Sequence, residues 1–454
     1  MNQLKFPMKW SAVLVSSAFS GLMAVSTLSV AQSPVGLLDV YQMASLQDAS
    51  LAQVRAQYQA DQQNLDTAFA ALLPTIQADA SYAITDSSRD LSDVTSREVS
   101  LTLNQSLFRY ETRLGYEQVE KSVAASKLNL QAAEQDLVLR VTEHYFSVLL
   151  AQKTLVLFQA KEKADKSQLE RAEASAEVGL ASRVDVLQAK SSFDLSKSER
   201  INAENNLDIS FEKLMKITGK PIRSLKAFPD KVILPTDSFD MAELTQKAEK
   251  NNIQVQQAVS QLETATLEVD VQKGGYWPQV NFQAKVADTA YSDYNAGSTF
   301  NDSQRTSLAV TLSLPLYEGG ATQAKVAAAR FSKTAAKEGL RNSQEEARLN
   351  ARVQARNLKR GESLVAALQE AVNSNDAFVE AAEEGYKVGL KSMLEVLSAR
   401  SNQTAARKNL VESLHQQVLN KLRLESSIGD LTTDDLQAFD ALLQEIEVIR
   451  SESL

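Results

Sequence analysis

The chain carries one pattern twice. The segment VGLASRVDVL at residues 178–187 recurs as VGLKSMLEVL at residues 388–397, 210 positions later. Two further matches lie upstream, at offsets of 204 and 209: Leu73-Pro74 with Trp277-Pro278, and Leu107-Phe108 with Leu316-Tyr317. An internal repeat of this length predicts that each structural element and each functional feature occurs in two copies.

Helix-forming residues dominate both copies. The 454 residues include only 15 Gly and 8 Pro, and long stretches contain neither. This composition is typical of long helices and coiled coils. We therefore expect a mainly α protein built as an elongated repeat, although the length alone would suggest two or three compact domains.

Residues 1–31 have the features of a secretory signal peptide. Lys5 and Lys9 precede the apolar run 10–28, which ends in the small-x-small site Ser29-Val30-Ala31. A membrane anchor is the alternative, disfavoured because Ser and Gly dilute the apolar run. The remaining chain has no Cys and no apolar run of 18 residues, so we expect neither disulfides nor a transmembrane helix.

The repeats predict the same order of elements. The first, residues 32–220, gives a helix at 37–72, a β-hairpin at 75–108, a long helix at 111–177 and a helix at 182–215. The second, residues 241–430, gives a helix at 241–273, a β-hairpin at 279–317, a long helix at 321–387 and a helix at 392–426. A connector at 221–240 contains three of the eight Pro, and an acidic, partly helical tail covers 431–454.

The hairpin strands each have one apolar and one polar face. Residues 75–84 alternate with period two, and the same alternation recurs at 99–108, 279–288 and 307–316, with polar loops at 85–97 and 289–305. Four strands cannot close a barrel, and an exported protein would not leave their edges exposed, so closure requires several chains. Packing of the hairpins on a core, or against each other as a sandwich, is the alternative.

Aromatic residues gather where strands meet helices: Phe108, Tyr110, Tyr276, Trp277 and Tyr317. Such a position fits a girdle at a membrane interface. An aromatic plug at a packed junction is the alternative interpretation.

The long helix at 111–177 would span roughly 100 Å. Apolar residues recur in it every seven positions, in a row that includes one histidine: Val123, Leu130, Leu137, His144, Ala151 and Phe158. Heptad rows seat a helix against its neighbours as in a coiled coil. We therefore interpret His144 as a packed seam residue instead of a ligand or a base.

Composition also excludes several classes of function. The net charge is −9 without a basic stripe, which disfavours nucleic-acid binding. With two His, no Cys, no glycine-rich phosphate loop and no metal-spaced cluster, we expect no catalytic site, no metal and no cofactor. The adjacent pairs Glu345-Glu346 and Glu383-Glu384 fit solvated helix faces.

Several motifs in this order resemble those of the TolC-type outer-membrane efflux proteins, over residues 33–430. They are LLPTIQADASYA (72–83), WPQVNFQAKV (277–286), LSLPLYEGG (312–320), AEEGYKVGL (382–390) and the two VGL turns. The resemblance implies a homotrimer in the outer membrane of a Gram-negative bacterium. Each protomer would give four strands to a twelve-stranded transmembrane β-barrel, and its helices would line a periplasmic tunnel.

The resemblance also implies partners and a gate. A periplasmic adaptor and an inner-membrane pump or ABC transporter would dock at the helix-turn tips Val178, Gly179, Leu180, Val388, Gly389 and Leu390. Asp185, Tyr386, Lys391 and Glu395 fall on the family's gate positions, which suggests that a Lys391–Asp185 link closes the tip. Ser398 and Ala174 depart from the family pattern, and ordinary solvated turn charges are the alternative interpretation.

These inferences converge on a passive export duct for multidrug efflux, type I protein secretion or both, with energy supplied by a partner pump. A trimeric coiled-coil adhesin or a periplasmic structural spacer would also explain the helices and the export signal. Neither explains two amphiphilic hairpins at matched positions in a repeat.

Overall fold

The computed structural model describes residues 34–85, 94–222, 224–229, 239–292 and 301–444. Residues from Pro34 onward form one compact unit. The predicted signal peptide lies outside the described residues. Among the described residues, no helix has the length and apolar character needed to cross a membrane.

The elements follow the duplicated order. In the first half they are α1 (Leu37–Gln47), α2 (Ala49–Ala70), β1 (Thr75–Thr85), β2 (Val94–Phe108), α3 (Tyr110–Glu177) and α4 (Arg183–Thr218). In the second half they are α5 (Met241–Asn251), α6 (Ile253–Lys273), the short 3-10 helix η1 (Gly274–Tyr276), β3 (Gln279–Ser292), β4 (Ser303–Ser313), α7 (Ala321–Lys387) and α8 (Met393–Ile428). A last helix, α9 (Thr433–Asp440), lies in the C-terminal tail.

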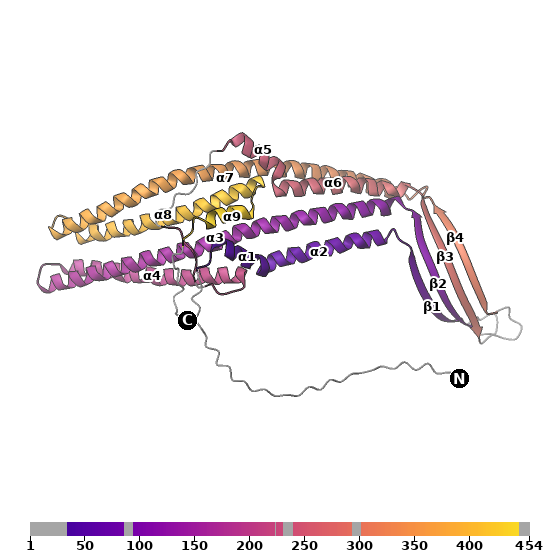
Figure 1. The fold of residues 1–454 in the computed structure, drawn as a ribbon, viewed down its shortest axis with the longest axis horizontal. Helices are drawn as coiled ribbons and strands as arrows, with labels where there is room; N and C mark the ends of the chain where they lie inside the picture. Colours follow the sequence, from indigo (N-terminus) through magenta and orange to yellow (C-terminus); the bar gives the residue numbers. More distant parts are fainter. Residues whose placement is uncertain (1–33, 86–93, 223, 230–238, 293–300, 445–454) are drawn as a thin grey trace, which may run out of the picture. The chain divides into compact units, whose positions relative to one another are not determined.

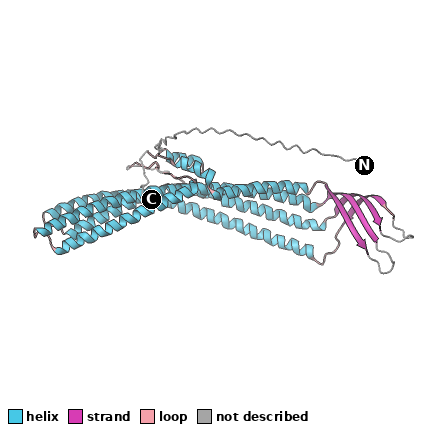
Figure 2. Ribbon diagram, turned by 90° about the horizontal axis from the view of Figure 1, so that it is seen from below, coloured by secondary structure: helices cyan, strands magenta, loops and turns pink. Residues whose placement is uncertain are grey.

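The four strands form one sheet at one end of the long helices, and the α3–α4 and α7–α8 turns lie at the opposite end (Figures 1 and 2). Each long helix packs against the helix that follows its turn, and α3 also contacts α6 and α8. The two halves are therefore joined side by side along their length.

Two predicted helices are each broken once. The expected helices 37–72 and 241–273 divide at Asp48 and Asn252, two positions 204 residues apart. The Asp48 carboxylate accepts a hydrogen bond from the Leu51 backbone N–H at 2.9 Å, and the Asn252 side chain accepts one from the Gln254 N–H at 3.0 Å. Short polar side chains cap a new helix in this way, so an Asx residue inside a helical pattern can restart the helix.

The strands also differ from the prediction. β2 begins at Val94 and not at 99, and β4 covers Ser303–Ser313 where 307–316 was expected. The extra β2 residues pair with β1, and the Arg97 guanidinium lies over the Tyr82 ring, 5.7 Å from its centroid. After Val94 the residues of this extension are polar on both faces, so no alternation of apolar and polar residues predicted a strand there.

The sheet has the antiparallel order β1-β2-β3-β4, so β1 and β4 are its edges. The register places the apolar residues of all four strands on one face: Ala78 is opposite Leu101, Leu101 is opposite Val286, and Ala284 is opposite Leu308. This face is exposed in the single chain. The other face is polar and carries a Lys285–Glu98 ion pair at 2.8 Å.

The main apolar core lies where α1, α3, α4 and α8 meet the connector. Tyr145 is fully buried there, and its hydroxyl lies within hydrogen-bond distance of the backbone oxygens of Lys226 (2.6 Å) and Val35 (3.2 Å). His144, the histidine of the heptad row, is half-buried. His415 is buried beside the Phe146 ring, with 5.2 Å between the ring centroids.

The burial of His415 predicts that the folded protein is less stable in acid. Desolvation, aided by the Lys153 charge, lowers the pKa of His415 to about 4 from its usual 6.5. Between these pH values the unfolded chain binds a proton that the folded chain does not, so stability falls as the pH falls from 6.5 to 4. We expect His415→Leu to lose less thermal stability than the wild type when the melting midpoint is compared at pH 7.5 and pH 5.

His144→Gln is the matched control, because its histidine is only half-buried and should contribute less to the acid sensitivity. An equal loss of melting temperature in the wild type and His415→Leu would show that His415 is not the source of the acid sensitivity.

Candidate functional site

The two helix turns have the same backbone structure. After α3, the Leu180 N–H donates to the Ser175 oxygen at 2.8 Å and the Gly179 N–H to the Ala176 oxygen at 3.0 Å. After α7, Leu390 and Gly389 make the equivalent bonds to Gly385 (2.8 Å) and Tyr386 (3.1 Å). These bonds define a Schellman motif, which satisfies the last carbonyl groups of a helix.

Glycine is required at both turns by backbone conformation alone. Gly179 and Gly389 have φ of +76° and +77°, in the left-handed region. A Cβ built at either position meets no atom within 4 Å. Glycine is therefore favoured at these positions by backbone conformation and not by lack of space, because any other residue would be strained by about 1–2 kcal/mol at this φ.

The helices that follow the turns begin with capping boxes. The Ser182 hydroxyl oxygen accepts from the Asp185 N–H at 3.1 Å, and the Asp185 carboxylate accepts from the Ser182 N–H at 2.9 Å. Ser392 and Glu395 make the same reciprocal bonds at the start of α8. Asp185 and Glu395 thus both serve as first-turn caps, 210 residues apart.

Within the single chain, Lys391 and Asp185 each bond a residue of their own turn, and the Lys391–Asp185 link stays a prediction. The Lys391 ammonium donates to Glu395 at 2.7 Å, while Asp185 is held by Ser182. The Lys391 stem lies over Gly385, where an added Cβ would be 2.6 Å from its Cγ, and this path directs the ammonium toward α8. The Lys391 bond, with the Ser392 cap, lowers the pKa of Glu395 to about 2.

Tyr386 lies between the two helix pairs. It packs on two small apolar clusters, one with Val396 and one with Ala172 and Met393. Burial, together with the nearby Asp185 charge, raises the pKa of its phenol. Of the four predicted gate residues, the structure therefore brings Lys391 and Glu395 into direct contact and places Tyr386 near Asp185.

The tips themselves expose apolar side chains. Leu180 and Leu390 are 84% and 81% exposed, and Val178 and Val388 are exposed beside them. Isolated apolar residues on a surface are ordinary, but here the same residues are exposed at two neighbouring turns.

At the other end of the helices, the predicted aromatics are only partly brought together. The Trp277 ring stacks on Tyr110 with centroids 5.2 Å apart and lies 6.5 Å from Phe108. Tyr276 is half exposed and Tyr317 is almost fully exposed.

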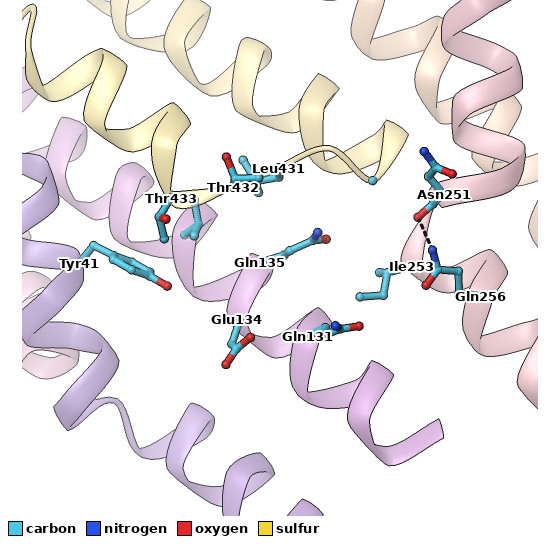
Figure 3. Close-up of a pocket in the computed structure, with 12 residues that line it drawn as sticks. Tyr41, Gln131, Glu134, Gln135, Asn251, Ile253, Gln256, Leu431, Thr432 and Thr433 are labelled. Atoms are coloured by element: carbon cyan, nitrogen blue, oxygen red, sulfur yellow. Dashed lines mark hydrogen bonds between the residues drawn. The ribbon is translucent and has the colours of Figure 1, made fainter. Parts of the chain in front are cut away.

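A cleft of about 410 Å³ lies between α1, α3, the α5–α6 break and the segment after α8 (Figure 3). Tyr41, Glu134 and Gln256 are among its lining residues, and Gln256 donates to the Asn251 backbone oxygen at 3.1 Å. The lining set holds one carboxylate and no His, Lys or Arg. Among the described residues, no group of His, Asp and Glu has the arrangement of a metal site.

Charged side chains of α7 and α8 form ion pairs that the sequence did not lead us to expect. Glu383, expected on a solvated face, accepts two hydrogen bonds from Arg400 on α8, at 2.7 and 2.9 Å. Asp376 accepts one hydrogen bond from Arg407, also on α8, at 2.9 Å. The two acidic residues are seven positions apart on α7 and the two arginines are seven positions apart on α8, so opposite charges at the same spacing on the two helices of a hairpin were a usable signal.

A family model described as outer membrane efflux protein matches residues 40–220 and 244–430. The chain belongs to the outer membrane efflux protein family. The prediction of this family from the sequence is thus confirmed. The two matched segments are separated by the connector, as a duplicated chain requires.

Individual relatives agree. Outer membrane protein TolC of Escherichia coli (strain K12) is 28% identical over 441 residues, which cover 95% of this chain and 88% of that protein. Proteases secretion protein PrtF of Dickeya chrysanthemi is 25% identical over 435 residues, 91% and 92% of the two chains. The crystal structure of the Campylobacter jejuni CmeC outer membrane channel has a TM-score of 0.75 at 16% identity, covering 89% of each chain.

The predicted fold class and the predicted function as an outer-membrane channel are confirmed by these likenesses. The individual gate and docking residues stay predictions, to be tested one by one.

The geometry of the turns predicts opposite effects for two glycine substitutions. We expect Gly389→Ala to lower the melting temperature, because alanine at φ +77° costs about 1–2 kcal/mol. Gly115→Ala should raise it, because Gly115 lies inside α3 with open space around it and alanine favours a helix by about 0.5–1 kcal/mol. Thermal unfolding followed by circular dichroism measures both, and shifts of the same sign would refute the turn analysis.

Proposed function

We propose that this protein works as a homotrimeric, passive conduit that spans the outer membrane and extends into the periplasm. A periplasmic adaptor and an inner-membrane pump or ABC transporter would deliver the exported substrate to it. The observation that carries the proposal is the sheet, which has a continuous exposed apolar face and two unpaired edges.

The sheet has the dimensions and chemistry of part of a barrel. β1 and β4 have 11 residues each, and strands of about 9–11 residues cross a bilayer when tilted. In lipid, every backbone polar group needs a partner, so an open sheet edge is not stable there. Closure by further copies of the same chain satisfies the edges of β1 and β4 together.

The repeat offsets predict how the copies join. Adding 204 to a β1 residue and 209 to a β2 residue converts the pair Thr75–Asn104 into Gln279–Ser313, which is the observed β3–β4 register. The two hairpins therefore have the same strand register once these offsets are added to the residue numbers.

The same operation applied to the β2–β3 pairing gives the contact between protomers. Leu101 faces Val286 within the chain, so Val310 of β4 should face Tyr82 of β1 in the next copy. Leu312 then faces Ala80, and Leu308 faces Ile84. All of these residues belong to the apolar face, whereas a shift of one residue would oppose apolar and polar faces.

This register can be tested by cross-linking, because the natural chain has no Cys. We expect Val310→Cys/Tyr82→Cys to form disulfides between copies and to give covalent trimers on denaturing gels, since opposite strand residues have Cα atoms about 4.5–5.5 Å apart. Val310→Cys/Ala78→Cys is the matched control, displaced by four residues, or about 13 Å along the strand. Equal cross-linking of both pairs would exclude the register, and no covalent trimer from either would count against the closed barrel.

The exposed tips fit a docking role for the adaptor. Val178, Leu180, Val388 and Leu390 form a repeated apolar surface at the end of the helices remote from the sheet. The name of PrtF refers to protease secretion, which supports proteins as one class of cargo. Small toxic molecules are the other class, and the pump would select between them.

Conduction tests the function itself. In a planar lipid bilayer, the purified protein should give small single-channel currents, and Lys391→Ala should raise them because it removes the bond that ties the turn after α7 to Glu395. Lys387→Ala is the control, since Lys387 pairs with Glu384 at 2.6 Å within α7 alone. Folded trimers that carry no current in any form would overturn the conduit proposal.

A further inference from the structure

Arg400 joins three helices above the tips. Its Nε and Nη2 donate to Glu383 of α7 at 2.9 and 2.7 Å, and its Nη1 donates to the backbone oxygen of Ala164 in α3 at 3.1 Å. The Arg400 side chain is only 12% exposed. One guanidinium on α8 therefore binds both its own helix pair and the pair formed by α3 and α4.

The next residue of α3 extends this contact to the fourth helix. Asp165 is 1% exposed, and its carboxylate accepts a hydrogen bond from Ser192 of α4 at 3.2 Å. Burial raises the pKa of Asp165, an effect opposed by Ser196 and by the charges of Lys161 and Arg400. We call Ala164, Asp165, Ser192, Glu383 and Arg400 the four-helix node.

The node lies close to a second contact between the same helix pairs. Nearer the turns, Met393 of α8 packs on Ala172 and Ala189, and its sulfur accepts from the Gln168 side-chain amide at 2.9 Å. Arg400 is seven residues further along α8, about 10 Å along the helix axis. Any motion that carries α8 away from α3 breaks both contacts.

Separation is opposed most strongly at the node. An arginine makes several directed hydrogen bonds from one planar group, and a hydrogen bond from a charged donor is stronger than one between neutral groups. Moving α8 away removes the Ala164 bond of Arg400. The Met393 contact, in comparison, is small and mainly apolar.

We propose that Arg400 is a latch between the two helix pairs, which holds the periplasmic end of the tunnel closed independently of the turn residues. The inference rests on the proposed conduit function, because it concerns how that tunnel opens. Opening requires the guanidinium to leave Ala164 while it keeps Glu383.

The chain offers a matched control for the latch. Arg407 also lies on α8 and pairs with a carboxylate of α7, Asp376, at 2.9 Å. Its hydrogen bond stays within the α7–α8 pair. Arg407→Gln thus removes an arginine–carboxylate pair of the same kind without touching a bond to α3.

A buried thiol reports separation without any need for conduction. Ala189 is fully buried at the contact with Met393, so Ala189→Cys gives the Cys-free chain one shielded thiol. In purified trimers we expect maleimide to label this thiol about tenfold faster when Arg400→Gln is added, the factor set by losing one charge-assisted hydrogen bond. Arg407→Gln should leave the labelling rate unchanged, and Arg400→Lys should lie between.

Single-channel recording then links separation to opening. Arg400→Gln should raise the current, and a disulfide between Gln168→Cys and Met393→Cys in the same background should return it to the wild-type value until a reductant is added. Melting temperatures and trimer content of all variants confirm that folding is intact.

The outcomes are distinguishable. Labelling that is equal in Arg400→Gln and Arg407→Gln would overturn the latch, as would faster labelling without a rise in current. If wild type and variants all fail to conduct while Arg400→Gln still labels faster, the conduit function fails and the contact between helix pairs stands as a structural one only.

Discussion

The unpaired backbone of β1 and β4 is the constraint on which the rest of the structure depends. Each edge presents N–H and C=O groups that need partners, and the exposed apolar face beside them has no cover within the chain. Both needs are met if identical copies continue the sheet in a closed ring within lipid. The long helices then surround a common axis, because each is joined to a strand of that ring.

Duplication makes this closure geometrically simple. The contact between β2 and β3 within the chain is already a contact between two repeats, so the proposed contact between chains would repeat it with other residues. The helices follow the same duplication, because α3 packs between α2 and α6, and α7 packs against α6. The repeats differ at the turns, where Ala181 stands in the first and Lys391 at the matching position of the second.

Much of this was predictable, and the failures have physical causes. Periodicity placed the long helices and the apolar faces, because both depend on local patterns. Periodicity did not predict the helix breaks at Asp48 and Asn252, because each break depends on one capping side chain. It also did not predict the β2 extension, which is stabilised by pairing with β1. The Lys391–Glu395 bond is a local contact between residues four apart at the start of α8, whereas the Arg400 node depends on packing between helices, which local patterns do not specify.

The symmetry of the purified protein in detergent, measured by electron cryomicroscopy, tests the closed barrel most directly. We expect a three-fold particle with twelve strands, in which Val310 of one copy faces Tyr82 of the next. A monomer, a different number of copies, or hairpins that fold back onto the helices would contradict it.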